Sequence, residues 1–565
     1  MKEFITRVVD ELHQSLKESL SREQIEKLIE VPKQAEKADF SFPCFSLAKS
    51  LRKNPAIIAQ DLADSFSAEG VDARAENAYL NFTVKRDQFS KSIIENILEH
   101  KEHYGHSDKG KGLLNIVEYS SANISKEMHI GYIRGIMIGS SLYKISQALG
   151  YETVAINHLG DYGINFGMII VAYKRWGSEE DLQQGGNHYL NMLYVKFREE
   201  EKKDASLTDE ARAWFKRLEA GDEEAYGLWQ HFKEISLRDF QVVYERLGSH
   251  FDSYAGESFY SDKMPAARQE LLDKGLISLD QGAEIIDLED EHLPNIIVTS
   301  SNGTSLYITR DIAAALYRYN HYHFNKNIYV VGSEQRLHFQ QLKAIIKKMG
   351  YGWYKDMIHV DHGLINLEGG GKISSREGNV TLLNDVLDVS IEKSLELINQ
   401  KNPDLEDKEE IARMVGFGAI AFRELSTSRV KDYTFRWEDA LSFEGETGPY
   451  IQYTNVRCHS LLSKRDVKFS EAAYDTLDDP FSSELLRELS LFTTTIQNAF
   501  SRYEPAIISR YLINVAKLFN KFYQNVTILT ESDAECAAKL ALVKSVSQVL
   551  ENGMNLINME APKRM

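Results

Sequence analysis

A short polar segment at residues 120–132 has the residue types and spacing of a phosphate-binding loop. It follows an apolar run that predicts a strand and precedes an apolar stripe that predicts a helix. At such a junction the first amides of the helix point at an anion. His129 can donate to a phosphate oxygen, and Gly131 lets a nucleotide approach the backbone. A lone His-x-Gly at a helix start is more often plain packing, so this segment alone does not decide the function.

A second polar segment, residues 370–379, is flanked by glycines and carries two cations, Lys372 and Arg376. Loops of this kind supply positive charge to a phosphate group during transfer, where catalysis is largely positioning and electrostatics. An ordinary exposed loop would look the same, and the residues leave both interpretations open.

The elements that must position these segments follow a βαβ pattern. Residues 113–119 predict a buried strand, Ile133 to Ile145 stripe a helix that ends at Gly150, and residues 153–157 predict the next strand. The pattern predicts an α/β fold in three parts. These are a small α/β domain at 1–110, an α/β domain at 111–400 with a polar helical insertion at about 175–290, and a helical domain at 401–565.

Local signals support the first of these parts. Ser21 with Gln24 predicts a capping box at the start of a helix, and residues 78–84 predict a strand. A linker rich in Gly and Lys at 105–112 marks the expected boundary.

Composition excludes few functions. The 565 residues include 84 acidic and 66 basic ones, and the net charge of −18 argues only mildly against nucleic-acid binding, because local basic surface sets phosphate attraction. No apolar run approaches the ~20 residues that span a bilayer. The three cysteines lie far apart, which predicts neither a disulfide framework nor a metal site and fits a reducing cytoplasm.

Taken together, the two polar segments resemble the HIGH and KMSKS signatures of class I aminoacyl-tRNA synthetases, in the expected order. Other blocks resemble those of arginyl-tRNA synthetases and extend the resemblance over essentially the whole chain. These blocks are EYSSAN at 118–123, NHLGDYG at 157–163, ETGPYIQY at 446–453 and EAPKRM at 560–565. The resemblance implies a Rossmann-like parallel-sheet catalytic domain between a small N-terminal domain and a C-terminal helical bundle.

The resemblance also implies an arginine pocket. A planar guanidinium favours carboxylates in bidentate geometry, and Glu118 and Asp311 match the family's acids at these positions. Tyr307 precedes Asp311 by one helical turn, so a helix would place both on one face. Asn123 and Gln335 match positions that hold the amino-acid head group.

The implied reaction has two steps. The carboxylate of L-arginine attacks the α-phosphorus of ATP, and the terminal adenosine hydroxyl of tRNA(Arg) then attacks the adenylate. His129 and Lys372 would stabilise charge on the phosphates, with Lys126 as a further cation and Mg²⁺ accompanying ATP. The residues that match the family's ATP site are Gly131, His129, Ser374 and Ser375.

For the transfer RNA the resemblance implies two contacts. Asn81 and Phe82 would contact a base at the elbow of the molecule, with Phe82 stacking on it. Tyr453 and Met565 would read the anticodon loop. A strand-end turn for the first pair and core packing for Tyr453 are the plainer alternatives. We further expect a cytoplasmic monomer.

The chain departs from the family most clearly at Tyr132, where the second histidine of HIGH is usual. A phenol stays neutral at neutral pH, and loss of one such contact can cost about 10²–10³ in rate. Further departures surround the same site, at Ala122, Glu127, Gly135, Ile136, Tyr162, Ile164 and Asn165. Three hypotheses follow. The first is a working synthetase with a variant site, such as a second copy that resists an inhibitor. The second is an enzyme that activates an arginine analogue or supplies arginyl-tRNA to a biosynthetic pathway, and the third is a weakened paralogue that binds arginine or transfer RNA as a regulator.

Overall fold

The computed structural model describes residues 2–30, 32, 38–299, 307–367 and 382–565. The chain divides into two compact units. One comprises Met1–Tyr104, Thr454–Phe492 and Asn514–Asn552, and the other comprises Gly105–Tyr453, Thr493–Ile513 and Gly553–Met565. The C-terminal helices therefore contribute to both units.

The first unit contains a three-stranded antiparallel sheet of order β1-β3-β2. The predicted capping box is confirmed, since Ser21 accepts from the amide of Gln24, whose side chain accepts from the amide of Ser21. The predicted strand at 78–84 is β3. The elements of this part of the chain are α1 (Lys2–Leu16), α2 (Arg22–Leu28), β1 (Phe40–Pro43), α3 (Ala48–Leu51), α4 (Pro55–Ser65), β2 (Val71–Glu76), β3 (Tyr79–Val84) and α5 (Arg86–His100).

Asp39 ties the sheet of this unit to α18 (Pro480–Ser490). Its carboxylate is 1% exposed and accepts from the amide of Val84 at 2.9 Å and from the guanidinium of Arg487 at 2.8 Å. Arg86 lies 3.5 Å from the same carboxylate. A buried carboxylate needs such partners, because isolated burial of its charge is costly.

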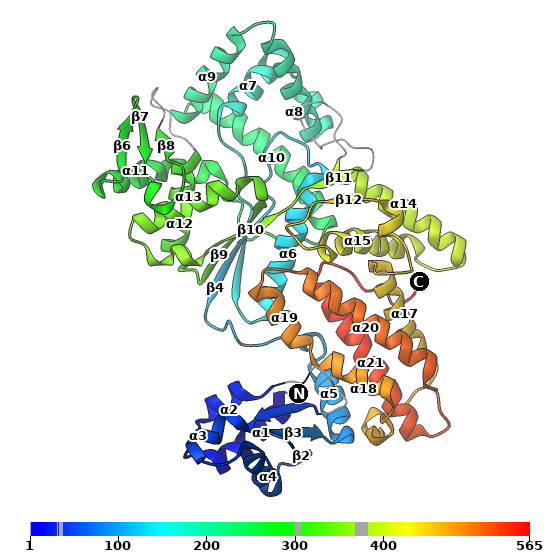
Figure 1. Cartoon of the computed structure of the whole chain (residues 1–565). Helices are drawn as coiled ribbons and strands as arrows, with labels where there is room; N and C mark the ends of the chain where they lie inside the picture. The colour runs from blue at the N-terminus through cyan, green and yellow to red at the C-terminus, as the bar shows by residue number, and fades with distance from the viewer. Residues whose placement is uncertain (1, 31, 33–37, 300–306, 368–381) are drawn as a thin grey trace. The chain divides into compact units, whose positions relative to one another are not determined.

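The second unit is built on a four-stranded parallel sheet of order β10-β9-β4-β5 (Figure 1). The fold class predicted from the sequence is thereby confirmed. The strands are β4 (Leu114–Glu118), β5 (Glu152–Ile156), β9 (Lys326–Gly332) and β10 (Met357–His362). Because β5 lies on one side of β4 and β9 on the other, the strand order reverses next to β4. Open α/β sheets bind ligands outside the carboxyl ends of the strands at such a switch point.

Helices cover this sheet and fix its loops. α6 (Ile133–Ala148) packs on β4, β5 and β9. α12 (Tyr307–Tyr322) and α13 (Arg336–Lys348) share a core with Ile116, Ile156 and Tyr329 of the strands. Tyr307 and Asp311 therefore lie on one helix, as their spacing predicts.

The insertion follows α7 (Ile164–Trp176) and is largely helical, with α8 (Glu179–Glu201), α9 (Ser206–Glu219), α10 (Glu223–Arg246) and α11 (Met264–Asp273). It also contains strands that we did not predict, β6 (Ile277–Asp280) and β7 (Ala283–Ile286), which form an antiparallel sheet with β8 (Ile296–Thr299). Gln281 and Gly282 both have positive φ, at 47° and 82°. That conformation is typical of a two-residue hairpin turn, so the Gln-Gly dipeptide was the available signal.

The C-terminal part is helical as predicted, with one exception. β12 (Tyr433–Phe435) pairs in parallel with β11 (Ile365–Leu367), and three residues are too few for a periodicity to reveal. The helices are α14 (Leu383–Lys401), α15 (Lys408–Ser426), α16 (Trp437–Ala440), α17 (Gly448–Leu462), α18, α19 (Phe492–Ser501), α20 (Ala506–Asn525) and α21 (Asp533–Leu556). None of the described helices is long and apolar enough to cross a membrane.

Candidate active site

The loop that follows β4 carries the first polar segment to the start of α6. Ser120, Ser121 and Ser125 adopt positive φ values of 70°, 51° and 62°. Such conformations are uncommon for residues other than glycine and concentrate at functional sites. The loop is held to the block at 157–163, because Ile124 donates to the carbonyl of Gly160 at 3.2 Å and Gly160 donates to that of Ala122 at 3.0 Å.

His129 caps the short helix Ile130–Tyr132 that leads into α6. Its Nδ1 accepts from the amide of Gly131 at 3.1 Å, so the neutral ring carries its proton on Nε2. Burial, together with the charge of Lys126, lowers the pKa of His129. The imidazole is therefore neutral at pH 7 and has one N–H that can donate to a phosphate oxygen.

Tyr132 lies beside His129, with ring centroids 4.8 Å apart. Burial raises the pKa of Tyr132, and hydrogen bonds with the side chain and backbone of Asn123 oppose that rise. The phenol is thus neutral and engages a residue predicted to hold the amino-acid head group. Residue types and spacing did not predict this contact.

Asn123 and Lys126 both line a small depression of about 60 Å³. Tyr162 and Glu257 border the same space. The ammonium of Lys126 lies 5.4 Å from the ring centroid of Tyr194 on α8, a favourable position for a cation. The structure thus brings Asn123 and Lys126, both in the loop after β4, to the same small depression.

Glu118 ends β4 at the switch point and is 5% exposed. Its Oε2 lies 2.5 Å from Nη1 of Arg318, a fully buried residue of α12. The guanidinium of Arg318 also lies 3.3 Å from the hydroxyl of Tyr260. A buried carboxylate paired with a buried guanidinium is held in one orientation, so the position of Glu118 is set before any ligand binds.

Asp311 lies seven residues before Arg318 on α12 and bonds to Nε2 of His338 at 2.6 Å. Burial disfavours the charge of Asp311, but the bond from His338 and neighbouring positive charges lower its pKa. Burial likewise opposes the charge of His338, but Asp311 raises its pKa. Asp311 and His338 form an ion pair. His338 lies in the first turn of α13, three residues after Gln335, which immediately precedes that helix.

Glu118 and Asp311 belong to one electrostatic cluster. His158 is half-buried, and burial lowers its pKa while Glu118, Asp311 and Asp161 act to raise it. Tyr307 begins α12, but its side chain is outside the described part of the chain. Sequence reasoning did not identify Arg318, His338, His158 or Glu257. Arg318 had a signal, because residues seven apart on a helix share a face.

The second polar segment, with Lys372, Ser374 and Ser375, lies outside the described residues. Its neighbours on both sides are described. Leu367 ends β11 before it, and after it Leu382 forms a bridge with His129 while Leu383 donates to the carbonyl of Met128 at 2.9 Å. The chain that leaves the second segment is therefore hydrogen-bonded to the first.

The residues predicted to contact transfer RNA differ in exposure. Asn81 is on β3 and half-buried, bonded to Ser41 at 2.7 Å. Phe82 is fully buried, with its ring 5.1 Å from that of Phe66. Base stacking by Phe82 disagrees with this burial, because the ring has no exposed face.

Tyr453 and Met565 come together in the second unit. Tyr453 is 42% exposed on α17, and its ring centroid lies 6.5 Å from that of Phe443. Phe443 and Met565 both pack against the core of Ile398 and Val415 between α14 and α15. Phe443 thus lies next to Tyr453 and packs on the same core as Met565.

Three family patterns match the chain. The family described as tRNA synthetases class I (R), catalytic domain, matches residues 93–437. The DALR anticodon binding domain matches residues 451–565, and the arginyl tRNA synthetase N terminal domain matches residues 5–84. The arginine–tRNA ligase of Clostridioides difficile (strain 630) is 48% identical over 568 residues, with 100% of both chains covered. That of Halothermothrix orenii is 46% identical over 568 residues, again with 100% of both covered.

Solved structures share the fold. The arginyl-tRNA synthetase of Thermus thermophilus aligns with a TM-score of 0.81 and 24% identity over 99% of both chains. That of Plasmodium falciparum aligns with a TM-score of 0.78 and 20% identity, covering 100% of this chain and 99% of the other. With its catalytic pattern matched and its relatives aligned end to end, the chain belongs to the arginyl-tRNA synthetases, in class I of the aminoacyl-tRNA synthetases.

Proposed function

We propose that the chain joins L-arginine to tRNA(Arg) at the expense of ATP, with the switch point beside β4 as its active site. The observation that carries this proposal is the hydrogen bond from the start of α14, the first helix after the second polar segment, to the first polar segment. Leu383 donates to Met128 next to His129, so the chain that follows the second polar segment is held beside the imidazole of His129. A transferring phosphate needs donors from both segments at once.

In the first step the pocket orients arginine. Glu118 and Asp311 bind the guanidinium through their carboxylates, which Arg318 and His338 hold in place. Asn123 and Gln335 hold the amino-acid head and leave its carboxylate free, and Tyr307 contacts the arginine from the same helix as Asp311. A carboxylate oxygen attacks the α-phosphorus of ATP, the bond to the β-phosphate oxygen breaks, and pyrophosphate leaves.

His129 donates from Nε2 to a phosphate oxygen, and Lys126 and Lys372 add positive charge. Gly131, Ser374 and Ser375 complete the ATP site. Mg²⁺ enters with ATP, whose phosphate oxygens are its ordinary ligands. Within the described residues, no group of three or more His, Cys, Asp or Glu side chains could hold a metal ion.

In the second step a ribose hydroxyl of the terminal adenosine attacks the carbonyl carbon of the adenylate, and AMP leaves. Asn81 contacts the elbow of the transfer RNA, and Tyr453 and Met565 contact its anticodon loop. The domain boundaries at residues 110 and 400, the monomeric state and the cytoplasmic location stay predictions. Light scattering on the purified chain would check the monomer.

The experiment is aminoacylation of purified tRNA(Arg) with labelled arginine and ATP. His129→Ala should lower charging by about 10²–10³-fold, the cost of one donor to the transition state. His292→Asn is the matched control, because His292 is exposed and its φ of 57° suits asparagine. A wild-type chain that binds arginine or transfer RNA but charges none would contradict the proposal and leave a regulatory paralogue.

Tyr132→His tests the departure from the family at this position. Because the phenol of Tyr132 bonds to Asn123, histidine there would remove that bond while adding a second imidazole beside His129. Unchanged adenylation would show that Tyr132 does not limit the rate. Faster adenylation would show that the phenol weakens a working site.

A further inference from the structure

One face of α8 holds the loop after β4 from the side of the insertion. Asn187, Asn191 and Tyr194 share that face, because they are four and three residues apart on the helix. The carboxamide of Asn187 donates to the carbonyl of Lys126 at 2.7 Å, and that of Asn191 donates to the carboxylate of Glu127 at 3.3 Å. The ring centroid of Tyr194 lies 5.4 Å from the ammonium of Lys126. Three side chains of one helix face therefore contact two consecutive residues of the loop.

Asn187 is the centre of a buried chain of hydrogen bonds. Its carboxamide oxygen accepts from the hydroxyl of Ser236 on α10 at 2.7 Å, and the oxygen of that hydroxyl accepts from the amide of Ser125 at 3.0 Å. Together with the bond to Lys126, this chain holds the backbone of two consecutive loop residues. Ser125 has a φ of 62°, a conformation that persists only when the surrounding structure imposes it. Asn187 and Ser236 supply that restraint.

A break in α8 turns Asn187 toward the loop. Gly186 has a φ of 54° and a ψ of −138°, outside the helical range, and glycine adopts such a conformation far more readily than other residues. The amide of Asn187 thereby loses its helical partner and donates to the carboxylate of Asp239 on α10 at 2.8 Å. A Cβ on Gly186 would lie 2.8 Å from an oxygen of the same carboxylate. The break and the close approach of the two helices therefore both depend on glycine.

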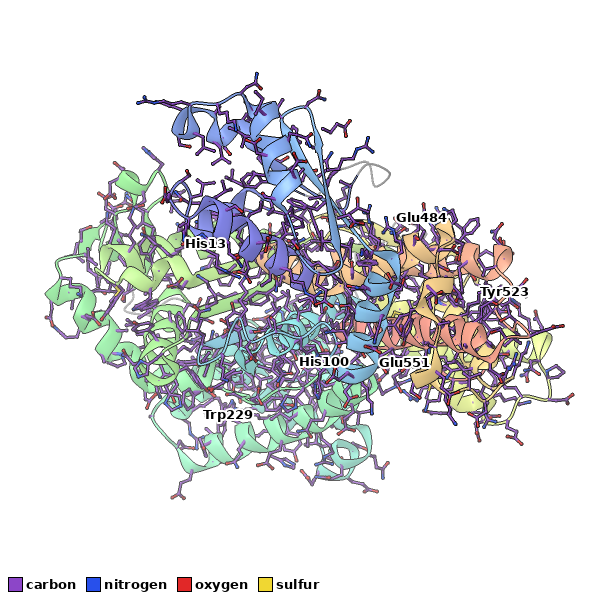
Figure 2. All side chains as sticks on the ribbon, turned by 90° about the horizontal axis from the view of Figure 1, so that it is seen from below. His13, His100, Trp229, Glu484, Tyr523 and Glu551 are labelled. Carbon is purple, nitrogen blue, oxygen red and sulfur yellow. The ribbon has the colours of Figure 1, made fainter. Side chains whose placement is uncertain are left out.

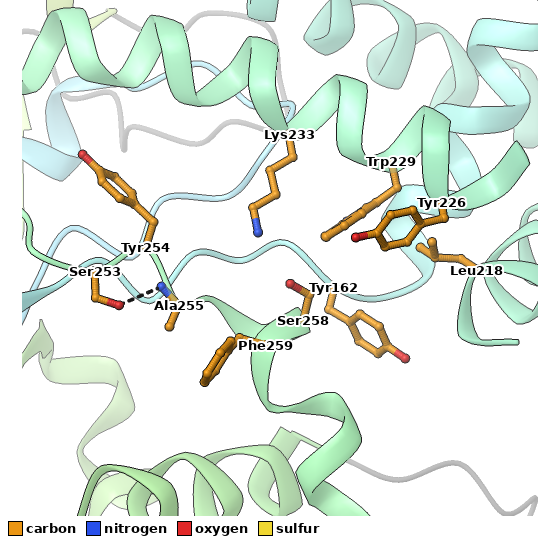
Figure 3. Close-up of a pocket in the computed structure, with 10 residues that line it drawn as sticks. All are labelled: Tyr162, Leu218, Tyr226, Trp229, Lys233, Ser253, Tyr254, Ala255, Ser258 and Phe259. Carbon is orange, nitrogen blue, oxygen red and sulfur yellow. Dashed lines mark hydrogen bonds between the residues drawn. The ribbon is translucent and has the colours of Figure 1, made fainter. Parts of the chain in front are cut away.

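α10 is itself fixed in the turns before Ser236. The indole of Trp229, which is labelled in Figure 2, donates to the carbonyl of Asp161 at 2.8 Å. The ammonium of Lys233 donates to the carboxylate of the same residue at 2.5 Å, and Figure 3 shows both side chains leaving one side of α10. Asp161 is fully buried in the block at 157–163, which is hydrogen-bonded to the loop after β4. Ser236 therefore acts on the loop from a helix that cannot shift without breaking buried polar contacts.

We propose that Asn187 is a positioning residue of the adenylation step, which holds the loop so that Lys126 and His129 face the phosphates of ATP. The inference rests on the proposed function and gives the insertion a part in the first step. Asn187 acts through the carbonyl of Lys126 and, by way of Ser236, through the amide of Ser125. A displacement of about 1 Å at a reacting centre can lower a rate by about 10²-fold, so a helix of the insertion sets the rate of the chemistry.

The first test is Asn187→Asp, assayed by pyrophosphate exchange over a range of pH. An ionised carboxylate cannot donate to the carbonyl of Lys126, so kcat should fall by about 10²-fold in alkaline buffer. Burial beside Asp239 raises the pKa of such a carboxyl, and its protonated form regains the donor. The activity relative to wild type should therefore recover as the pH falls. Thermal unfolding over the same range supplies the Tm of each protein, which a change of position alone leaves unaltered.

Ser236→Ala is the second variant, because it removes the hydroxyl between Asn187 and Ser125 and adds no charge. It should lower kcat by about 5- to 10-fold, the value of one hydrogen bond. In a Lys126→Ala background each effect should be at least about 3-fold smaller, since substitutions that act through one group are not additive. Asn320→Asp is the matched control, because Asn320 is exposed on α12 and receives the same charge.

Titration with ATP alone separates this inference from the proposed function. In alkaline buffer Asn187→Asp should raise the Kd of ATP by about 10-fold, because a displaced ammonium loses a bond to a charged group. If wild type charges no tRNA(Arg) but this difference in Kd is found, the proposed function fails and the hold of Asn187 on the loop stands. If wild type charges tRNA(Arg) while Asn187→Asp and Ser236→Ala keep its kcat, the inference fails and the proposed function stands. Full additivity with Lys126→Ala, or a loss of kcat that only follows a loss of Tm, would also overturn the inference.

Discussion

Gly131→Ala tests whether the position of His129 depends on the absence of one methyl group. A Cβ at residue 131 would lie 2.8 Å from both Cε1 and Nδ1 of the imidazole. Atoms in contact normally stand ~3.5–4.0 Å apart, so the ring must turn away from the amide that it accepts from at 3.1 Å. The backbone itself tolerates alanine, because Gly131 is not among the glycines with positive φ.

The expected cost falls more on the rate than on stability. The lost hydrogen bond is worth ~1 kcal/mol of folding free energy. A displaced donor in the transition state costs about 10²–10³ in kcat, or ~2.7–4 kcal/mol. The assay is pyrophosphate exchange in the presence of tRNA(Arg), with kcat and the KM for ATP measured separately. Gly227→Ala is the control, because a Cβ there meets no atom within 4 Å.

A double-substitution cycle with His129→Ala decides between two reasons for this glycine. If the glycine serves the imidazole, Gly131→Ala adds less than ~0.5 kcal/mol once the ring is gone. If it lets the nucleotide approach the backbone, the KM for ATP still rises in the His129→Ala background. That second outcome, or full activity of Gly131→Ala alone, would refute the argument from the ring.

Three further substitutions test other contacts. Burial raises the pKa of Glu257 to about 7 from an ordinary 4.5, so between these pKa values the folded chain holds a proton that the unfolded chain has released. The free energy of unfolding therefore falls as pH rises through this window, by at most ~3 kcal/mol, and urea titrations of Glu257→Gln should lack that fall. Asp39→Ala should lower the free energy of unfolding by ~2–4 kcal/mol, whereas Asp10→Ala, at a carboxylate whose side chain is 52% exposed, should change it by less than ~0.5 kcal/mol. Arg318→Lys should raise the KM for arginine and leave that for ATP unchanged, because lysine cannot reproduce the planar contact with Glu118; equal rises in both would mean a general loss of structure.

Local patterns of residue types along the chain were sufficient to predict several features of the site. The strand before Ser120, the helix after Tyr132 and the shared helix of Tyr307 and Asp311 follow from residue spacing, because nearest neighbours in sequence set helix and strand periodicity. The Ser21–Gln24 capping box was predictable for the same reason, since its two residues lie three positions apart. Three-residue β12 and the Gln281–Gly282 hairpin were too short for periodicity to reveal.

The sequence by itself determined the family, the fold class and the order of the two signature segments. Only the tertiary structure decided which charges meet. Glu118 is on β4, and Arg318 is on α12, the helix that leads into β9. The two pair because β9 lies beside β4 in the sheet. Asp311 pairs with His338 because α12 packs on α13. The same applies to the burial of Phe82 and to the bond between Tyr132 and Asn123. Ion pairs and exposure depend on elements far apart in the chain packing together, and spacing along one segment carries no information about that packing.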